Sequence, residues 1–293
     1  MKMVESLKNP ILILLPLLFI LSSLSLFGEP SDGFSTDLSV EWSSGKTELT
    51  FTFPLSEEHN PSPNTRSAFT RESISELGFS FVNTFSRIQL NSQQTVGDYL
   101  KRNPETALRI NSVAAGEYTS SSSSFAKDYS EFRITYTYNL HPHLIKHFFT
   151  HTSESSPDPI LRYVPSGSFS GIVIYVEEEL PVHGTSYTAA ITPCLFPRIY
   201  NEDMELLVSK DMLPPDTLKN WGMASYFTRD EIGQLSSRVG EVPLYIKAKA
   251  LFGETPTDII IPMEGADTML STEDTIELIT EGKIAIVYDS PSR

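Results

Sequence analysis

Short stretches in which apolar and polar residues alternate constrain the fold of this chain most strongly. Residues 38–42 and 49–53 alternate in this way on either side of a turn at 43–46, and so predict a β-hairpin. Residues 132–138 repeat the pattern with aromatic and β-branched side chains, which favour strands. The N-terminal half is therefore expected to contain an antiparallel sheet with one buried face.

A helical period separates these predicted strands. Residues 68–88 are expected to form one helix, because apolar residues recur there at spacings of three and four. Its predicted buried stripe consists of Ile74, Leu77, Phe81, Phe85 and Ile88. A second helix is predicted to begin near Thr95 and to break or restart at Pro104. Residues 141–151 are predicted to form a short amphipathic helix.

Two polar stretches suggest how the chain is divided. The serine run 120–124 offers too little apolar surface to pack and is predicted to be a flexible loop. The Pro- and Ser-rich residues at 153–168 are predicted to be a linker. It would separate an N-terminal α+β module, 29–152, from a β-rich C-terminal α+β module, 169–293.

The C-terminal half alternates strands and helices irregularly. Residues 169–176 and 284–288 are apolar enough to be buried strands. Further strands or helical turns are predicted at 195–200, 205–208, 217–221, 244–251, 258–261 and 265–270. The fold expected from this order is α+β, a mostly antiparallel sheet with packed helices. Whether the two halves form separate lobes stays open.

The N-terminal segment predicts export from the cytoplasm. Within residues 1–28 two lysines precede the apolar run 11–20, which has the length of a secretory signal sequence. Cleavage is expected after Ser25 or Gly28, and an uncleaved anchor is the alternative. Because no cysteine stands there to accept a lipid, the product is expected to be periplasmic, either soluble or held by protein contacts.

Charge and cysteine content narrow the range of functions. A net charge of −15 repels phosphate backbones, so nucleic acid is not an expected partner. Cys194 is the single cysteine, which excludes an internal disulfide. It stands between apolar residues and prolines and is interpreted as a buried hydrophobe, not as a catalytic thiol.

Four histidines form the best candidate for a metal site. His143, His147 and His151 follow at intervals of four, so one helix would place them on one side, with His141 nearby. Zinc sites usually add Cys, Asp or Glu ligands, and Glu154 is the acidic residue close by. The alternative, which we prefer, is a histidine-rich polar face, so no metal is assigned.

Other charged residues are interpreted as structural. Glu177, Glu178 and Glu179 resemble paired carboxylates, but a solvated strand end explains them better. Arg238 and Asp258 are expected to make an ion pair or turn contact. No catalytic motif is present in the sequence, so we predict no catalytic or cofactor-binding residues, no cofactor and no enzymatic activity.

The order of structural residues in the second half resembles a known family. The resemblance rests on residues 171–174, 180–181, 193, 197–202, 221–226, 238–240, 243–248, 253, 257–261 and 282–288. They look like the C-terminal region of envelope proteins related to FlgT and FlgP, which form rings or collars around bacterial flagellar motors. The missing lipid-accepting cysteine and the long acidic segment 177–192 depart from that family, and the segment resembles spirochaete relatives.

The resemblance implies a structural role. The chain is expected to be a non-catalytic periplasmic protein of the flagellar motor periphery, with other periplasmic or motor proteins, or further copies of itself, as partners. Exposed sheet edges and aromatic residues would make the contacts. A periplasmic ligand-binding or chaperone-like module and a histidine-dependent metalloprotein are the alternatives. Within the fold, Gly171 and Gly253 would relieve backbone crowding, and Asp258 would bond neighbouring backbone amides.

Overall fold

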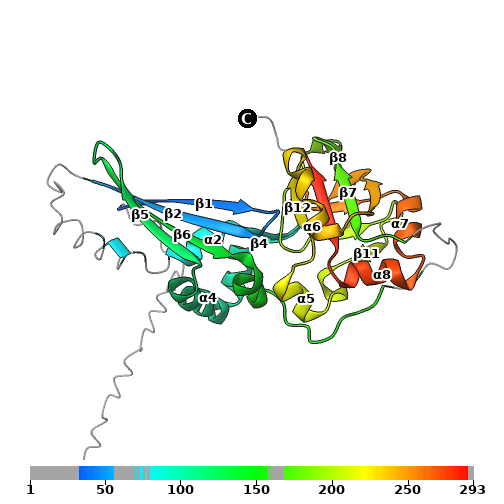
Figure 1. The fold of residues 1–293 in the computed structure, drawn as a ribbon, viewed down its shortest axis with the longest axis horizontal. Coiled ribbons are helices and arrows are strands. Elements are labelled where there is room, and N and C mark those ends of the chain that lie inside the picture. Colours follow the sequence, from blue (N-terminus) through cyan, green and yellow to red (C-terminus); the bar gives the residue numbers. More distant parts are fainter. Residues whose placement is uncertain are drawn as a thin grey trace, which may run out of the picture.

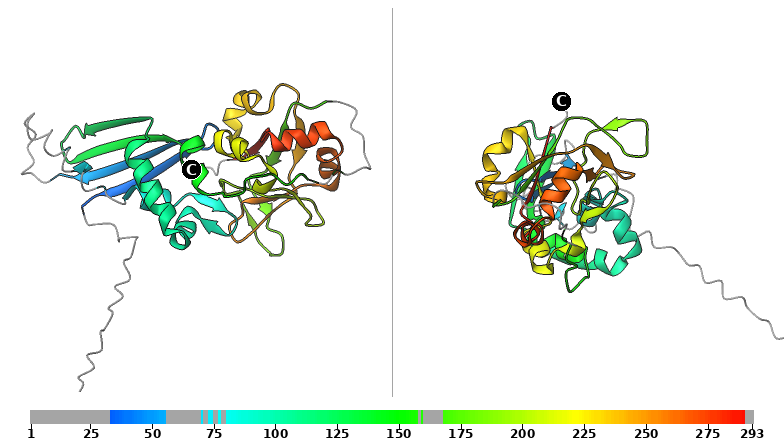
Figure 2. Two further views of the ribbon diagram at one scale, coloured as in Figure 1. Left: turned by 90° about the horizontal axis from the view of Figure 1, so that it is seen from below. Right: turned by 90° about the vertical axis from the view of Figure 1, so that its right-hand side faces the viewer.

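The computed structural model describes residues 33–55, 70, 73–74, 77, 80–157, 159 and 168–289. In Figure 1 a long antiparallel sheet with helices on one side lies at one end, and a layered α/β unit lies at the other. Figure 2 shows the same sheet extending away from that unit in a second view. The α+β class predicted from the sequence is confirmed. Within the described residues no helix is long and apolar enough to cross a bilayer.

The first domain is built on a four-stranded antiparallel sheet. Its order is β1-β2-β6-β5, with bounds β1 Ser35–Glu41, β2 Lys46–Pro54, β6 Glu131–Asn139 and β5 Ser120–Phe125. The predicted hairpin and the predicted strand at 132–138 are both confirmed. Alternate residues of β2 and β6 are buried on one face, as their periodicity requires.

The serine run is a strand, so the prediction of a flexible loop there was wrong. Each residue of β5 pairs with β6, from Ser120 opposite Thr137 to Phe125 opposite Phe132. The serine side chains are exposed, so they contribute no core. The strand forms because a short turn returns the chain beside β6, and the backbone N–H and C=O groups of the two strands then pair.

Three helices cover the buried face of this sheet, namely α2 Ser80–Phe85, α3 Val96–Arg102 and α4 Pro104–Gly116. The Phe81 ring lies 5.1 Å from that of Tyr136, and Phe85 lies 5.2 Å from Tyr138. A small hairpin, β3 Gln89–Asn91 and β4 Gln94–Thr95, leads into α3. The predicted helix start and the break before α4 are confirmed.

The predicted helix at 68–88 is only partly described. Its described continuous part is α2, and residues 68–69, 71–72, 75–76 and 78–79 lie outside the described residues. Leu77, Phe81 and Phe85 are buried as predicted, whereas Ile74 is 46% exposed. Ile74 was therefore wrongly assigned to the buried stripe.

Residues 141–151 do not form one helix, which corrects a second prediction. The chain makes a wide turn, η2 Leu140–Leu144, and then a short 3₁₀ turn, η3 Ile145–His147. Pro142 explains the break: it disfavours helical backbone at the residue before it, and His141 has φ −103° and ψ 132°. The peptide bond between these two residues is cis.

The second domain contains a parallel sheet that was not predicted from the sequence. Its order is β12-β16-β7-β13, with bounds β12 Ser225–Thr228, β16 Ile284–Tyr288, β7 Ile172–Val176 and β13 Leu244–Lys247. Both central strands, β7 and β16, are almost wholly buried. Continuous apolar runs are typical of such strands, because helices and loops cover both faces.

A second, mixed sheet has the order β11-β10-β15-β14. Its bounds are β11 Leu206–Val208, β10 Ile199–Tyr200, β15 Asp258–Ile260 and β14 Ala250–Phe252. The remaining elements are the hairpin β8 Leu180–Pro181 and β9 Thr188–Ala189, the helices α5 Pro215–Asn220, α6 Ser236–Val239, α7 Met263–Met269 and α8 Glu273–Thr280, and the 3₁₀ turns η4 Lys210–Met212 and η5 Arg229–Gln234. The hairpin predicted around 201–203 is confirmed.

The two predicted close approaches of the backbone are present. A Cβ on Gly171 would lie 2.5 Å from the carbonyl oxygen of Val239. Gly253 has φ +111°, and a Cβ there would lie 2.3 Å from the Cβ of Ser92 in the first domain. Only glycine fits both positions without a shift of the backbone or its neighbours.

Candidate functional site at the domain junction

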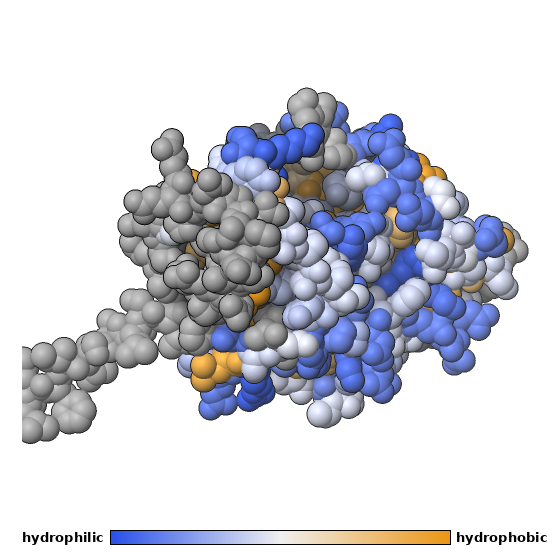
Figure 3. Space-filling model, turned by 60° about the vertical axis from the view of Figure 1, so that its left-hand side comes forward, coloured by the Kyte–Doolittle hydropathy of each residue, from blue (hydrophilic) through white to orange (hydrophobic). Residues whose placement is uncertain are grey.

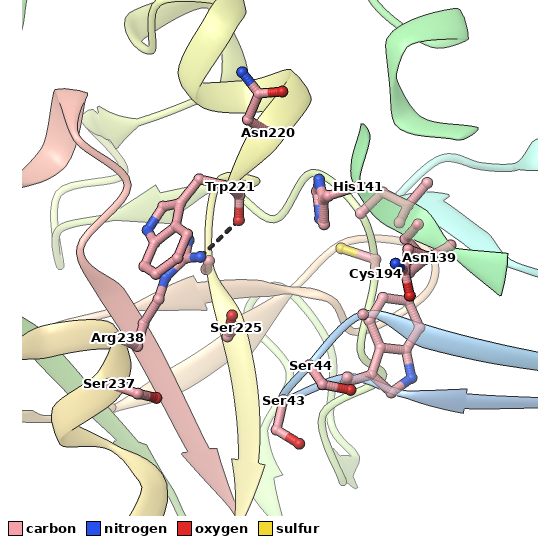
Figure 4. Close-up of a pocket in the computed structure, with 15 residues that line it drawn as sticks. Ser43, Ser44, Asn139, His141, Cys194, Asn220, Trp221, Ser225, Ser237 and Arg238 are labelled. Carbon is pink, nitrogen blue, oxygen red and sulfur yellow. Dashed lines mark hydrogen bonds between the residues drawn. The ribbon is translucent and has the colours of Figure 1, made fainter. Parts of the chain in front are cut away.

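A pocket of about 380 Å³ lies where the two domains meet. It is lined by residues 42–45, 139–141, 194–195, 220–221, 224–225 and 237–238. The first two segments belong to the first domain, and the others come from α5, β12, α6 and the loop before β10. Figure 4 shows Trp221 and Arg238 on one side of this pocket and His141 and Asn139 on the other. The fold thus brings together side chains that are far apart in the sequence.

Arg238 is the buried cation of this pocket. Its guanidinium donates hydrogen bonds to the carbonyl oxygens of Trp221, at 2.6 Å, and Gly222, at 2.9 Å, just after the end of α5. It also stacks on the indole of Trp221, 4.6 Å from the ring centroid. Burial lowers the pKa of Arg238 to about 9.

Of the two contacts predicted for Arg238, the structure therefore shows the turn contact and not the ion pair. No carboxylate of the described residues forms a salt bridge with its guanidinium, and its Nε atom is buried without a hydrogen-bond partner. These two carbonyl groups directly follow α5, at the helix end that carries partial negative charge, so they are suitable acceptors for a cation.

His141 packs against the turn after α5. Gly222 has φ +80°, and a Cβ there would lie 2.5 Å from the imidazole carbon Cε1 of His141. Burial and the nearby charge of Arg238 lower the pKa of His141 to about 4. Its Nδ1 atom is buried and has no hydrogen-bond partner. This ring is consequently a neutral component of the junction.

The turn after β1 attaches the first domain to β12. The backbone N–H of Tyr226 donates to the carbonyl oxygen of Trp42 at 3.3 Å, and the two rings lie 5.7 Å apart, edge to face. Ser43 Oγ donates to Glu231 Oε1 at 2.7 Å. The same carboxylate accepts from the N–H and hydroxyl of Thr228 through its other oxygen, which caps η5.

Asp258 makes a second, fully buried connection between the domains. Its carboxylate accepts hydrogen bonds from Ser92 Oγ at 2.7 Å, the backbone N–H of Arg198 at 3.1 Å and Thr257 Oγ1 at 3.3 Å. As predicted, Asp258 accepts a hydrogen bond from a backbone amide. That amide belongs to Arg198 in a distant loop, so the prediction of a neighbouring amide was wrong. Burial raises the pKa of this carboxyl despite the three donors.

The histidines predicted as metal candidates are dispersed. His143 Nδ1 donates to Glu117 at 3.0 Å, and His151 Nε2 donates to the carbonyl oxygen of Leu213 at 3.0 Å. His147 is half-buried, and burial lowers its pKa. Among the described residues no three His, Cys, Asp or Glu side chains gather as metal ligands. The irregular turns of η2 and η3 separate rings that a continuous helix would have aligned.

Cys194 and the three glutamates lie where they were predicted. Cys194 is buried, and burial raises the pKa of its thiol to about 12. Its sulfur lies 3.6 Å from the hydroxyl of Tyr226, inside the junction. Glu177, Glu178 and Glu179 are exposed just after β7.

The pocket itself was not predicted from the sequence. Its lining comes from segments that share no motif or spacing, so no local pattern reveals it. One signal was available: the chain has two tryptophans, Trp42 and Trp221, and both line this pocket.

Comparison with known proteins gives matches to both domains. Residues 34–147 match a family model for the N-terminal domain of Treponema pallidum Tp0624, and residues 171–290 match a family model for the second domain of that protein. The two matches follow one another in the chain and together cover most of it. The search of curated proteins found no match.

Proposed function

We propose that this chain, whose two domains belong to the families of the N-terminal and second domains of Tp0624, is an exported structural protein of a spirochaete envelope. It acts by binding other proteins and not by turning over a substrate. Its finer placement, at the periphery of the periplasmic flagellar motor, is part of the proposal and rests on the resemblance to ring and collar proteins. Export rests on the signal-like segment 1–28, which lies outside the described residues.

The observation that carries this proposal is the open edge of β5. The strand is the last in its sheet, and the N–H of Ala126, just after β5, donates to the carbonyl oxygen of Glu131, the first residue of β6. Because the direction of backbone groups alternates along a strand, Ser120, Ser122 and Ser124 face β6. The N–H and C=O groups of Ser121 and Ser123 therefore point outward, and no other described strand pairs with them.

Within the described part of the chain, this edge lacks the charge and the proline that commonly prevent strand pairing. Native edge strands are commonly protected by Lys, Pro, a bulge or short length, because unpaired backbone groups attract other chains. β5 is six residues long, is uncharged and contains no proline. Its small side chains leave the backbone accessible from both faces, since the serines are exposed. The opposite edge differs, because Arg87 donates to the outward carbonyl of Thr36 on β1.

The face shown in Figure 3 offers no large apolar area of described residues for contact with another protein. On the face shown in Figure 3 the described residues are mainly hydrophilic, and apolar residues form small separate patches. Strand addition uses main-chain hydrogen bonds, so it needs no large apolar patch. A neighbouring envelope protein or a second copy of this chain would supply the added strand.

The test replaces Ser123 by proline in a strain in which the gene has been deleted and reintroduced. Proline removes one outward N–H and leaves the pairing groups of Ser122 and Ser124 in place. Ser123→Ala keeps the N–H and serves as the matched control. We expect S123P, and not S123A, to lose co-purifying partners and to impair motility to the extent that deletion does. Unfolding curves of both purified variants test whether the fold is retained.

Two results would contradict the proposal. Retention of the same partners by S123P and S123A would exclude the β5 edge as the contact. Normal swimming of the deletion strain, with every periplasmic motor density intact by tomography, would exclude the flagellar placement. Single cysteines at 121, 122 and 123 identify self-association, because the native Cys194 is buried and a disulfide-linked dimer would then arise from the introduced thiol.

A further inference from the structure

The junction pocket has a charge composition unlike that of the chain as a whole. The chain carries 37 Asp and Glu residues against 22 Lys and Arg, for a net charge of −15. Among the 15 residues that line the pocket there is no carboxylate, and Arg238 is the basic residue with a permanent charge. Although the chain is acidic overall, no carboxylate lines the pocket that contains the buried guanidinium of Arg238.

Arg238 is only partly satisfied within the pocket. It is 6% exposed, and its guanidinium has five N–H groups. The two carbonyl contacts described above use two of them, and Nε has no partner. Neutral carbonyl groups do not cancel a full positive charge. A buried charge is ordinarily paired, because leaving it without a counter-charge is unfavourable.

The surroundings of Arg238 suit an anion with an apolar part. Trp221 and Trp42 provide aromatic surface, and Asn139, Asn220 and Ser225 provide amide and hydroxyl donors. Figure 4 shows Asn139 and Ser225 on different sides of the pocket. Guanidinium groups bind carboxylate and phosphate oxygens through parallel hydrogen bonds, which makes arginine the usual choice for such groups. The volume of about 380 Å³ lies within the range of small-molecule sites.

We propose that the junction pocket is a binding site for a small anion bearing a phosphate or carboxylate group, with Arg238 as its counter-charge and the tryptophans as contacts for its apolar part. Because residues of both domains line the site, the bound anion would also stabilise the junction. This inference concerns a site remote from the serine edge strand and stands independently of the proposed structural role.

Both tryptophans line the site, so intrinsic fluorescence reports on it directly. The experiment titrates the full mature chain with inorganic phosphate, phenyl phosphate, citrate and benzoate at constant ionic strength, and follows tryptophan emission and Tm. We expect at least one probe to saturate below about 10 mM and to raise Tm. Saturation by the phosphates alone or by the carboxylates alone identifies the group recognised, and a preference for phenyl phosphate or benzoate identifies the aromatic contact.

Substitutions assign the binding to Arg238. Arg238→Gln is expected to weaken binding by about tenfold or more, and Arg238→Lys by less, because lysine keeps the charge and loses the fork. Arg109→Gln removes an exposed positive charge on α4 and is expected to leave the affinity unchanged. If R238Q does not fold, Ser44 at the exposed rim gives a second test. Ser44→Glu is expected to bind about tenfold more weakly than Ser44→Gln, which differs from it only in charge.

Three results would overturn the assignment of the junction pocket as an anion site. Absence of a saturable change with every probe up to about 10 mM would exclude the site. Saturable binding that is equal in wild type, R238K and R109Q, and equal in S44E and S44Q, would show that the anion binds elsewhere. A lowered Tm of the Arg238 variants with unchanged affinity would leave Arg238 a purely structural cap of α5.

Discussion

Protonation of His141 is predicted to loosen the junction between the two domains. The ring is partly buried, packs against Gly222 and lies close to Arg238, and its pKa is lowered from 6.5 to about 4. A group whose pKa is lower in the folded state stabilises that state while it is deprotonated, which for an imidazole is the neutral form. The contribution is complete above the unfolded pKa of 6.5 and is lost as the pH falls through the folded value of about 4.

The size of the effect follows from the two pKa values. One pKa unit corresponds to about 1.36 kcal/mol, so the lowering from 6.5 to about 4 represents roughly 3 kcal/mol once His141 is fully protonated. At about pH 5 the unfolded chain is mostly protonated at this position and the folded chain is not, which gives a loss of about 2 kcal/mol. That is a large fraction of the stability of an ordinary domain.

The assay measures urea unfolding of wild type and His141→Gln at several values between about pH 7.5 and about pH 5. Glutamine cannot be protonated, so H141Q is expected to be about 1–2 kcal/mol less stable near neutrality and to lose about 2 kcal/mol less on acidification. Comparing the two proteins at each pH removes the contributions of other titrating groups. His183→Gln, at an exposed position outside the junction, is the matched control. Parallel pH curves for wild type and H141Q would refute the reasoning.

Three further perturbations test the local structure, each by urea unfolding at neutral pH. Asp258→Ala leaves three buried donors without their acceptor and is expected to cost about 3–5 kcal/mol, whereas a loss below about 1 kcal/mol would contradict the network. Gly222→Ala combines a positive φ with a clash against the imidazole and should cost about 2–4 kcal/mol, while Gly233→Ala, with open space around it, should change little. Thr95→Ala removes the capping box of α3 and should lower the free energy of unfolding by about 1 kcal/mol. An unchanged urea midpoint would show that the capping box does not stabilise the fold.

The strands that follow a local rule were predictable. Alternation of apolar and polar residues at 49–53 and 132–138 places one face of each strand in the core, and hydrophobic burial enforces that placement wherever the strand lies. Thr95 and Pro104 likewise mark a helix start and a restart through backbone hydrogen bonding alone. These features depend on neighbours in the sequence, so the sequence is sufficient.

Features that depend on a distant partner were not predictable. The serines of β5 have no strand period, and they form a strand because β6 presents unpaired backbone groups beside them. The apolar runs of β7 and β16 indicate burial on both faces but not the direction of their neighbours, so the parallel sheet was missed. The histidine spacing suggested a helix, and Pro142 prevented it.

The sequence by itself determined the strands around 49–53 and 132–138, the helix start at Thr95, the absence of an internal disulfide and the burial of Cys194, because these follow from periodicity and composition. The tertiary structure decided that Trp42, His141, Trp221 and Arg238 share one pocket, and that the carboxylate of Asp258 joins two domains. The physical reason is that a buried charge or polar group must find its partners in space, and packing of whole elements, not spacing along the chain, determines which groups are within reach.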